Sequence, residues 1–110
     1  MSLIKEEILR GIEEAAERMG LDNEDLLEMI EDVLDDCIEK VAGLREAAAA
    51  GDGAKLSAIG HDIKGSTINY GLLAPSAIAK DLEINKLDAV DRIDELEDVL
   101  DQLKAMSIGI

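Results

Sequence analysis

The sequence predicts an all-α protein, an antiparallel up-and-down four-helix bundle with an additional N-terminal helix. Apolar residues recur every three or four positions over several long stretches, which is the spacing of amphipathic helices. One proline and little clustering of β-branched residues leave no clear basis for strands. Aromatic residues make up only 1% of the chain, so the core must be built from Leu, Ile, Val, Ala and Met.

Local signals define the first two helices. Residues 1–19 are predicted to form the first helix, and Gly20 ends it. Its apolar positions are Ile4, Ile8, Ile12, Ala15 and Met19. Asp22 or Asn23 then caps a long second helix. The apolar stripe of that helix, with spacings of four and three, consists of Leu26, Ile30, Val33, Cys37, Val41, Leu44 and Ala48, and is widened by Leu27, Leu34 and Ile38.

A Gly-Asp turn separates the second helix from the third. Gly51 is expected to end one helix and Asp52 to cap the next. The third helix is predicted from Ala54 to Tyr70, and Gly71 marks the structural turn that follows it.

The last two helices are shorter. Pro75 fits the first turn of a fourth helix, where its missing N–H does no harm. This helix carries Ile78, Leu82 and Ile84 and frays near Lys86. Asp88 is expected to cap the fifth helix, and 106–110 are expected to be a loose end. The apolar positions of the fifth helix are Val90, Ile93, Leu96, Leu100 and Leu103. Short turns between these helices favour antiparallel neighbours.

Length and charge narrow the classes of function. Residues 1–110, with a mass of 11.8 kDa, are expected to form one domain. The net charge of −15 argues against binding to nucleic acid or an anionic membrane, both of which favour basic patches. An acidic solvated surface explains most of this charge, and a partner with a basic rim is the alternative. Neither a membrane-spanning stretch nor a secretion signal is evident, and Cys37 reads as a buried free thiol, so we expect a cytoplasmic protein.

His61 is the only histidine and lies within the predicted third helix. A helical wheel at about 100° per residue places four apolar side chains within about 40° of the direction opposite to His61. These four residues are Leu56, Ile59, Ile63 and Tyr70. The apolar face therefore packs inward, and the imidazole is predicted to point to water, where it can react with a partner.

The residues near His61 support a reactive role. Gly60 and Gly65 each cost the helix about 1 kcal/mol relative to alanine, and we interpret them as leaving the imidazole open to a close partner. The alternative is that the two glycines arose by tolerated sequence drift and have no functional role. Lys64 lies one turn after His61, so its ammonium can reach a group attached to the ring. Taken alone, Lys64 would be an ordinary surface lysine.

These residues resemble the signature of histidine-containing phosphotransfer (HPt) domains. The matching pattern is His61-x-x-Lys64-Gly65, with Gly71 six residues later. Residues 47–56 are similar to the segment that precedes the histidine helix in the family, with a helix end, a Gly-Asp turn and a new helix.

The resemblance covers residues 24–105 and extends to the following helix, where Leu82-Glu83 is similar to the family pattern. Gly60 is a mild departure, because the family more often has alanine or another small residue there.

The resemblance implies a phosphotransfer protein of a two-component phosphorelay. His61 would accept a phosphoryl group from an aspartyl phosphate on a receiver domain, in a response regulator or hybrid sensor kinase, and pass it to another receiver. Lys64 would offset the negative charge that develops on the oxygens, and the partner would bring its own metal. The chain lacks a glycine-rich phosphate loop and a Walker lysine, so we expect a phosphoryl carrier without ATP-dependent kinase activity, cofactor or metal site of its own.

The receiver is expected to dock on the His61 side of the third helix. The candidate docking residues are Ser57, Gly60, Gly65, Ile68 and Leu72.

Helix register predicts a further site residue. If the third and fourth helices form a hairpin centred near Leu73, equal rises of about 1.5 Å per residue return the chain to the level of His61 near residues 83–85. Glu83 is thus expected to reach one ring nitrogen, fix the tautomer and leave the other nitrogen free to attack. In HPt-like domains that resemble the phosphoaccepting domain of chemotaxis kinases, a polar or acidic residue contacts the imidazole at this place. The alternative is a surface ion pair between Lys80 and Glu83.

Two other functions remain open from the sequence. The chain could be the phosphoaccepting domain of a chemotaxis-type histidine kinase, excised from a longer protein. It could also be an acidic helical adaptor in which His61 is incidental or a weak metal ligand. One histidine among scattered carboxylates lacks the ligand spacing of a zinc site, which disfavours the metal alternative.

Overall fold

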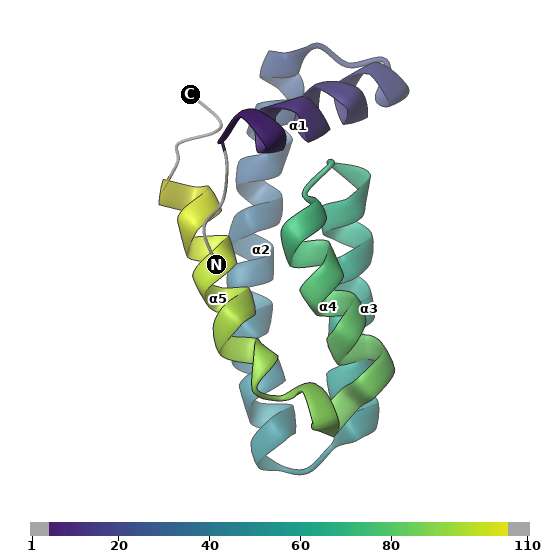
Figure 1. The fold of residues 1–110 in the computed structure, drawn as a ribbon, viewed down its shortest axis with the longest axis vertical. Coiled ribbons are helices and arrows are strands. Elements are labelled where there is room, and N and C mark those ends of the chain that lie inside the picture. Colours follow the sequence, from purple (N-terminus) through teal and green to yellow (C-terminus); the bar gives the residue numbers. More distant parts are fainter. Residues whose placement is uncertain (1–4, 106–110) are drawn as a thin grey trace.

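The computed structural model describes residues 5–105, and within them all the regular secondary structure is helical, with no strand (Figure 1). This confirms the all-α prediction. The helices are α1 (Lys5–Met19), α2 (Asn23–Ala49), α3 (Gly53–Asn69), α4 (Leu73–Asn85), the short 3₁₀ helix η1 (Lys86–Ala89) and α5 (Arg92–Ala105).

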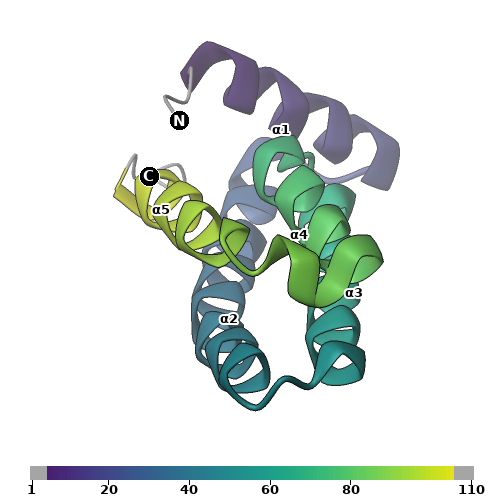
Figure 2. The ribbon, with the colours of Figure 1, turned by 60° about the horizontal axis from the view of Figure 1, so that its bottom comes forward.

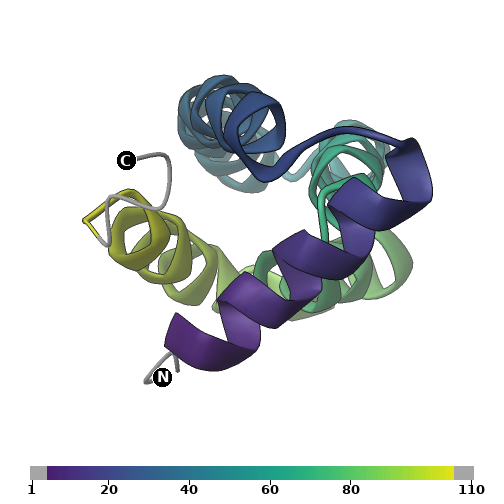
Figure 3. The same cartoon turned by 90° about the horizontal axis from the view of Figure 1, so that it is seen from above.

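Helices α2, α3, α4 and α5 form the expected antiparallel bundle, in which successive helices run in opposite directions (Figures 1 and 2). Each packs against two others, in the order α2, α3, α4, α5 and back to α2. The additional helix α1 lies across one end of the bundle, over α3 and α4, when the molecule is seen from above (Figure 3).

The core between these helices is aliphatic. Burying each large side chain of this kind contributes about 1.5–3 kcal/mol to folding. Cys37 is buried in the core as a free thiol, and desolvation raises its pKa to about 11. The largest fully buried side chains are Ile12, Leu26, Ile30, Leu34, Leu44, Leu56, Ile63, Leu72, Ile78, Leu82, Leu96 and Leu100.

The turns that follow α1, α2 and α3 form where the sequence predicts them. Asp22 and Asp52 cap α2 and α3, each accepting a backbone N–H hydrogen bond from the third residue that follows, at 2.9 and 3.0 Å. Gly20, Gly51 and Gly71 have φ of +70°, +67° and +77°, a conformation in which a side chain would be strained. Pro75 lies in the first turn of α4, as expected.

A glycine pair allows α1 to pass close to the α3–α4 turn. A Cβ added to Gly11 would lie 2.6 Å from the carbonyl oxygen of Gly71. Beside this crossing, Ile12, Ala15 and Ala16 are buried against the bundle. Because neither Gly11 nor Gly71 has a side chain, α1 can approach the α3–α4 turn this closely.

One predicted apolar position in α1 is wrong, and two in α2 lie only at the margin of the core. Met19 is 39% exposed because it ends α1 at the edge of the molecule. In α2, Val33 and Ala48 are only partly buried, whereas Leu34 and Ala47 are fully buried. An α-helix has about 3.6 residues per turn, whereas alternating spacings of four and three average about 3.5. Over the 27 residues of α2, this difference moves the buried stripe around the helix relative to the predicted positions.

The predicted end of α4 and start of α5 also require correction. Ile84 and Val90 are 60% and 37% exposed, because Ile84 lies on the outer side of α4 and Val90 lies in the connection. Asp88 belongs to η1 and does not cap α5, which begins at Arg92. The chain turns at Lys86, whose φ is +53°, and forms an extra 3₁₀ turn. The last helix therefore begins later in the sequence than predicted.

The third helix spans Gly53–Asn69, and Tyr70 is its C-cap residue, one residue earlier at each end than predicted. Among the described residues, no helix is long and apolar enough to cross a bilayer. The predictions for Ile4 and for residues 106–110 lie outside the described part of the chain.

Candidate functional site

His61 stands on the outer face of α3 with its side chain 64% exposed. Leu56 and Ile63 are fully buried, and Ile59 and Tyr70 are partly buried against the core. The apolar face of α3 therefore packs inward and leaves the imidazole in water, as the helical wheel predicts.

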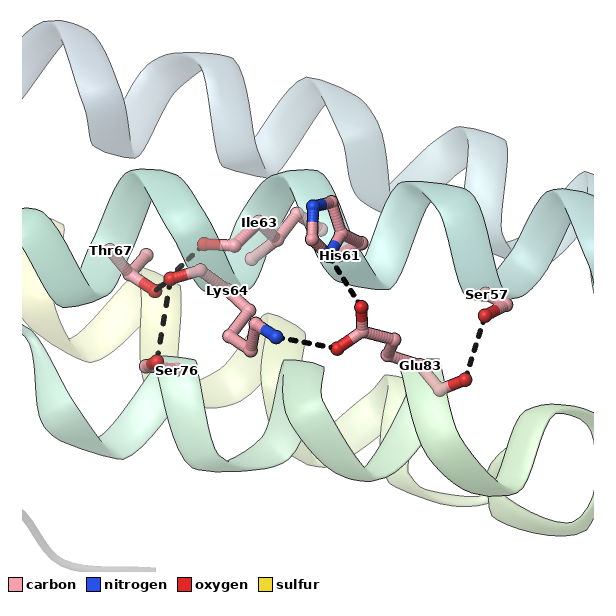
Figure 4. A network of polar contacts seen from close by, with 7 residues as sticks. All are labelled: Ser57, His61, Ile63, Lys64, Thr67, Ser76 and Glu83. Carbon is pink, nitrogen blue, oxygen red and sulfur yellow. Dashed lines mark hydrogen bonds and ion pairs between the residues drawn. The ribbon is translucent and has the colours of Figure 1, made fainter.

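The Glu83 carboxylate of α4 bridges His61 and Lys64 of α3 (Figure 4). One carboxylate oxygen, Oε2, lies 2.5 Å from His61 Nδ1, and Oε1 accepts a hydrogen bond from Lys64 Nζ at 2.7 Å. The register argument thus brings Glu83 to the ring as predicted. Glu83 makes these contacts in place of the alternative surface pair with Lys80.

The charge state of Glu83 determines which ring nitrogen is free. Hydrogen bonds from Lys64, and next from His61, hold the pKa of Glu83 below its usual value of 4.5. An ionised carboxylate only accepts hydrogen bonds, so Nδ1 of His61 must carry the proton that it donates to Glu83. In a neutral ring, Nε2 then keeps its lone pair, and this nitrogen faces away from Glu83 in Figure 4.

Close packing of α4 on α3 brings Glu83 into reach. A Cβ added to Gly60 would lie 2.9 Å from the carbonyl oxygen of Ala79 and 3.0 Å from the backbone nitrogen of Glu83. The Ser57 hydroxyl donates a hydrogen bond to the carbonyl oxygen of Glu83 at 2.7 Å. Gly60 thus permits the close approach of the Glu83 backbone, and the Ser57 hydroxyl holds its carbonyl oxygen.

Two hydroxyl groups donate hydrogen bonds to the backbone carbonyl groups of Ile63 and Lys64. The buried Thr67 hydroxyl donates to the carbonyl oxygens of Ile63 and Lys64 at 2.7 and 3.3 Å, and the Ser76 hydroxyl of α4 donates to Lys64 O at 3.4 Å. Sequence reasoning missed both residues. The available signal was a pair of small hydroxyl residues on the inward faces of the two helices.

The predicted docking residues divide into two groups. Gly65 has nothing within 4 Å of an added Cβ, and Ile68 is 42% exposed, so both lie on the open face beside His61. Gly60 and Leu72 are buried, which removes them from that surface. Gly60 is covered by α4, and Leu72 points into the core from the hairpin turn. Ser57 is partly buried and faces α4.

Within residues 5–105, no three His, Cys, Asp or Glu side chains are arranged to hold a metal ion. The groups present beside the exposed imidazole are the Glu83 carboxylate and the Lys64 ammonium.

The chain matches the model of a known protein family. The family model described as "Hpt domain" matches residues 28–106, which is most of the chain, from α2 through α5. No curated protein matched the chain. No solved structure matched it either. The matched region contains His61, Lys64 and Glu83, and Hpt domains act in histidine phosphotransfer within phosphorelays. The chain therefore belongs to the Hpt domain family.

Proposed function

We propose that this chain is a phosphorelay intermediate in which His61 accepts a phosphoryl group from an aspartyl phosphate on one receiver domain and passes it to another. The contact between Glu83 and His61 Nδ1 carries this proposal, because it leaves Nε2 exposed and nucleophilic. The family's role in phosphorelays favours receivers of response regulators or hybrid sensor kinases as partners, and a cytoplasmic location.

The proposed transfer balances without an external base. The Nε2 lone pair of His61 attacks phosphorus, an N–P bond forms, and the bond from phosphorus to the receiver's carboxylate oxygen breaks, so the receiver recovers its carboxylate. The ring keeps its Nδ1 proton and gains a positive charge. Glu83, 2.5 Å away, offsets that charge. Transfer to a second receiver reverses these bond changes.

Lys64 supplies the complementary charge. Its ammonium is 2.7 Å from Glu83 and the side chain is 30% exposed, one helical turn from His61. A phosphoryl group on Nε2 brings negative oxygens toward this turn, and the lysine can move to them from the carboxylate. The chain thus acts as a phosphoryl carrier, with the partner supplying the rest of the transition-state stabilisation.

Incubation with a phosphorylated receiver tests the proposal. The wild-type chain should acquire label that is acid-labile and alkali-stable, as expected for phosphohistidine. The His61→Gln variant should keep its helical signal and unfolding midpoint but acquire no label, because the side chain is outside the core. Label on this variant would refute the assignment of His61. No label on the wild type from several receivers would favour the adaptor alternative.

Lys64→Ala provides a second measurement on the same assay. It should slow transfer more than it weakens receiver binding, because the ammonium acts mainly on the charge that develops during transfer. An unchanged transfer rate would make Lys64 an ordinary surface residue.

A further inference from the structure

The outer side of α4 carries no carboxylate, although the whole chain has a net charge of −15. Helix α4 packs against α3 and α5. Its exposed residues are Leu73, Ala77, Lys80, Ile84 and Asn85. Among the residues whose exposure the structure describes, the exposed side chains of every other α-helix include at least one carboxylate. The outer side of α4 is therefore the helix face that repels a second strongly anionic molecule least.

The two carboxylates of α4 are turned toward its neighbours. Glu83 contacts His61 and Lys64 of α3, and its side chain is 21% exposed. Asp81 accepts a hydrogen bond from Arg92 of α5 at 3.1 Å, and its side chain is 29% exposed. These contacts hold both negative charges at the flanks of α4 and away from its outer side.

Four of the exposed residues form a stripe with the spacing of a coiled-coil seam. Leu73, Ala77, Lys80 and Ile84 follow one another at intervals of four, three and four, which keeps them on one side of the helix. Leu73 and Ile84 are 62% and 60% exposed, the highest values among the large apolar side chains that the structure describes. One exposed apolar side chain is ordinary, but two at the ends of a stripe without acidic residues indicate a surface for helix pairing.

This stripe is complementary to itself when its direction is reversed, because intervals of four, three and four read the same both ways. In an antiparallel pair of α4 helices, Leu73 of each copy lies opposite Ile84 of the other, and Lys80 lies opposite Ala77. The small alanine leaves room for the alkyl stem of the lysine, whose ammonium can extend to water. A parallel pair would instead set Lys80 against Lys80, which is a contact between like charges.

We propose that a second copy of this chain docks on the stripe of Leu73, Ala77, Lys80 and Ile84, so that two α4 helices pair antiparallel about a two-fold axis. Four residues per copy are far fewer than the roughly 20–30 a side of a standard interface, so the dissociation constant should be about 0.1–1 mM. His61 lies on α3, outside the stripe, and this inference does not depend on the proposed phosphotransfer.

Sedimentation equilibrium over a range of concentrations tests the association. The average mass should rise from 11.8 kDa toward twice that value as the concentration passes about 1 mM. The rise should be steeper at about 1 M salt than at about 0.1 M, because salt screens the repulsion between two anionic chains. A mass that stays at 11.8 kDa under both conditions would overturn the proposal.

Substitutions on the stripe locate the interface. Ile84→Glu should weaken association at least tenfold, since a two-fold pair places the new carboxylate against Leu73 twice. Met29→Glu is the matched control, because it makes the same change in net charge at a 40% exposed apolar residue of α2, and it should weaken association by less than about twofold. Lys80→Leu should strengthen association at least tenfold by removing the central charge from the seam. Equal weakening by the two glutamate variants, or no change with Lys80→Leu, would place the interface elsewhere.

Disulfide formation tests the antiparallel pairing. A mixture of the Leu73→Cys and Ile84→Cys variants should form a mixed disulfide under mild oxidation, whereas each variant alone should form much less of its own dimer. The native Cys37 does not compete, because it is buried in the core and its pKa is raised to about 11. Faster crosslinking of Ile84→Cys with itself than with Leu73→Cys would refute the antiparallel arrangement.

Discussion

Gly60→Ala is the most direct test of how the site is positioned. The added methyl group would lie 2.9 Å from Ala79 O, 3.0 Å from Glu83 N and 3.4 Å from Glu83 Cα. All three neighbours are backbone atoms, so no side-chain rotation can make room. Because normal contact begins near the largest of these distances, α4 must move away from α3 by a few tenths of an ångström at the level of Glu83.

Two opposing effects set the stability of this variant. Alanine is favoured over glycine in a helix interior by about 1 kcal/mol. Overpacking of a close contact costs about 1–3 kcal/mol. Gly60→Ala should therefore be neutral or destabilising by up to about 2 kcal/mol. Gly65→Ala is the matched control four residues after His61, where an added Cβ meets nothing within 4 Å. It should be stabilising by up to about 1 kcal/mol.

Denaturant unfolding measures the two free energies, and ¹⁵N NMR of His61 reports the tautomer. Gly60→Ala should weaken the preference for the Nδ1–H form, because the 2.5 Å contact between Nδ1 and Glu83 depends on the position of α4. Gly65→Ala should leave the preference unchanged. Equal stability of the two variants, with the same tautomer, would refute the argument that Gly60 sets the spacing of α3 and α4.

Three further predictions concern single residues. Gly65→Leu should keep or raise stability yet slow receiver docking at least tenfold, as measured by association kinetics; normal docking would show that the face need not be open. Since the folded-state pKa of Glu83 lies below 4.5, its contribution is present above that pH and is lost as the pH falls through the folded value. The stability gap between wild type and Glu83→Gln, followed by unfolding at each pH, should therefore close in acid; a gap that is independent of pH would contradict this. Lys86, with φ of +53°, should tolerate glycine with a gain of about 1 kcal/mol in unfolding free energy, and a loss would show that the backbone is not strained there.

Local signals predicted most helix ends, and their failure near residue 88 has an identifiable cause. Asp22, Asp52 and Gly71 act through their own backbone neighbours, so the sequence alone shows what they do. Asp88 has the composition of a cap, but its place is set by the turn at Lys86. A lysine with positive φ has no signature in the sequence, because tertiary packing imposes that conformation.

The parts of the candidate site that follow from regular helix geometry could be predicted from the sequence. The wheel gives the direction of His61 on α3, and equal helical rise gives the level of Glu83 on α4. Neither argument shows which flank of α3 the neighbouring helix covers. Gly60, adjacent to His61 in sequence, is therefore buried under α4, whereas Gly65 is open. The prediction that Leu72 lies on the docking surface was wrong for the same reason, because the hairpin turn directs its side chain into the core.

The burial of Gly60 links the fold to the chemistry. Residues on one ridge of α3 place Glu83 at two of its groups: Ser57 donates to its carbonyl oxygen, and His61 and Lys64 contact its carboxylate. On the same ridge, the absence of a side chain at Gly60 lets the backbone of Glu83 come this close to α3. Positions 57, 60, 61 and 64 have the i, i+3, i+4, i+7 spacing of such a ridge. A carboxylate that must meet two partners tolerates little displacement of its own backbone. The contact between Glu83 and His61 therefore depends on both helices: on the small residue before the histidine in α3 and on the position of the acidic residue in α4.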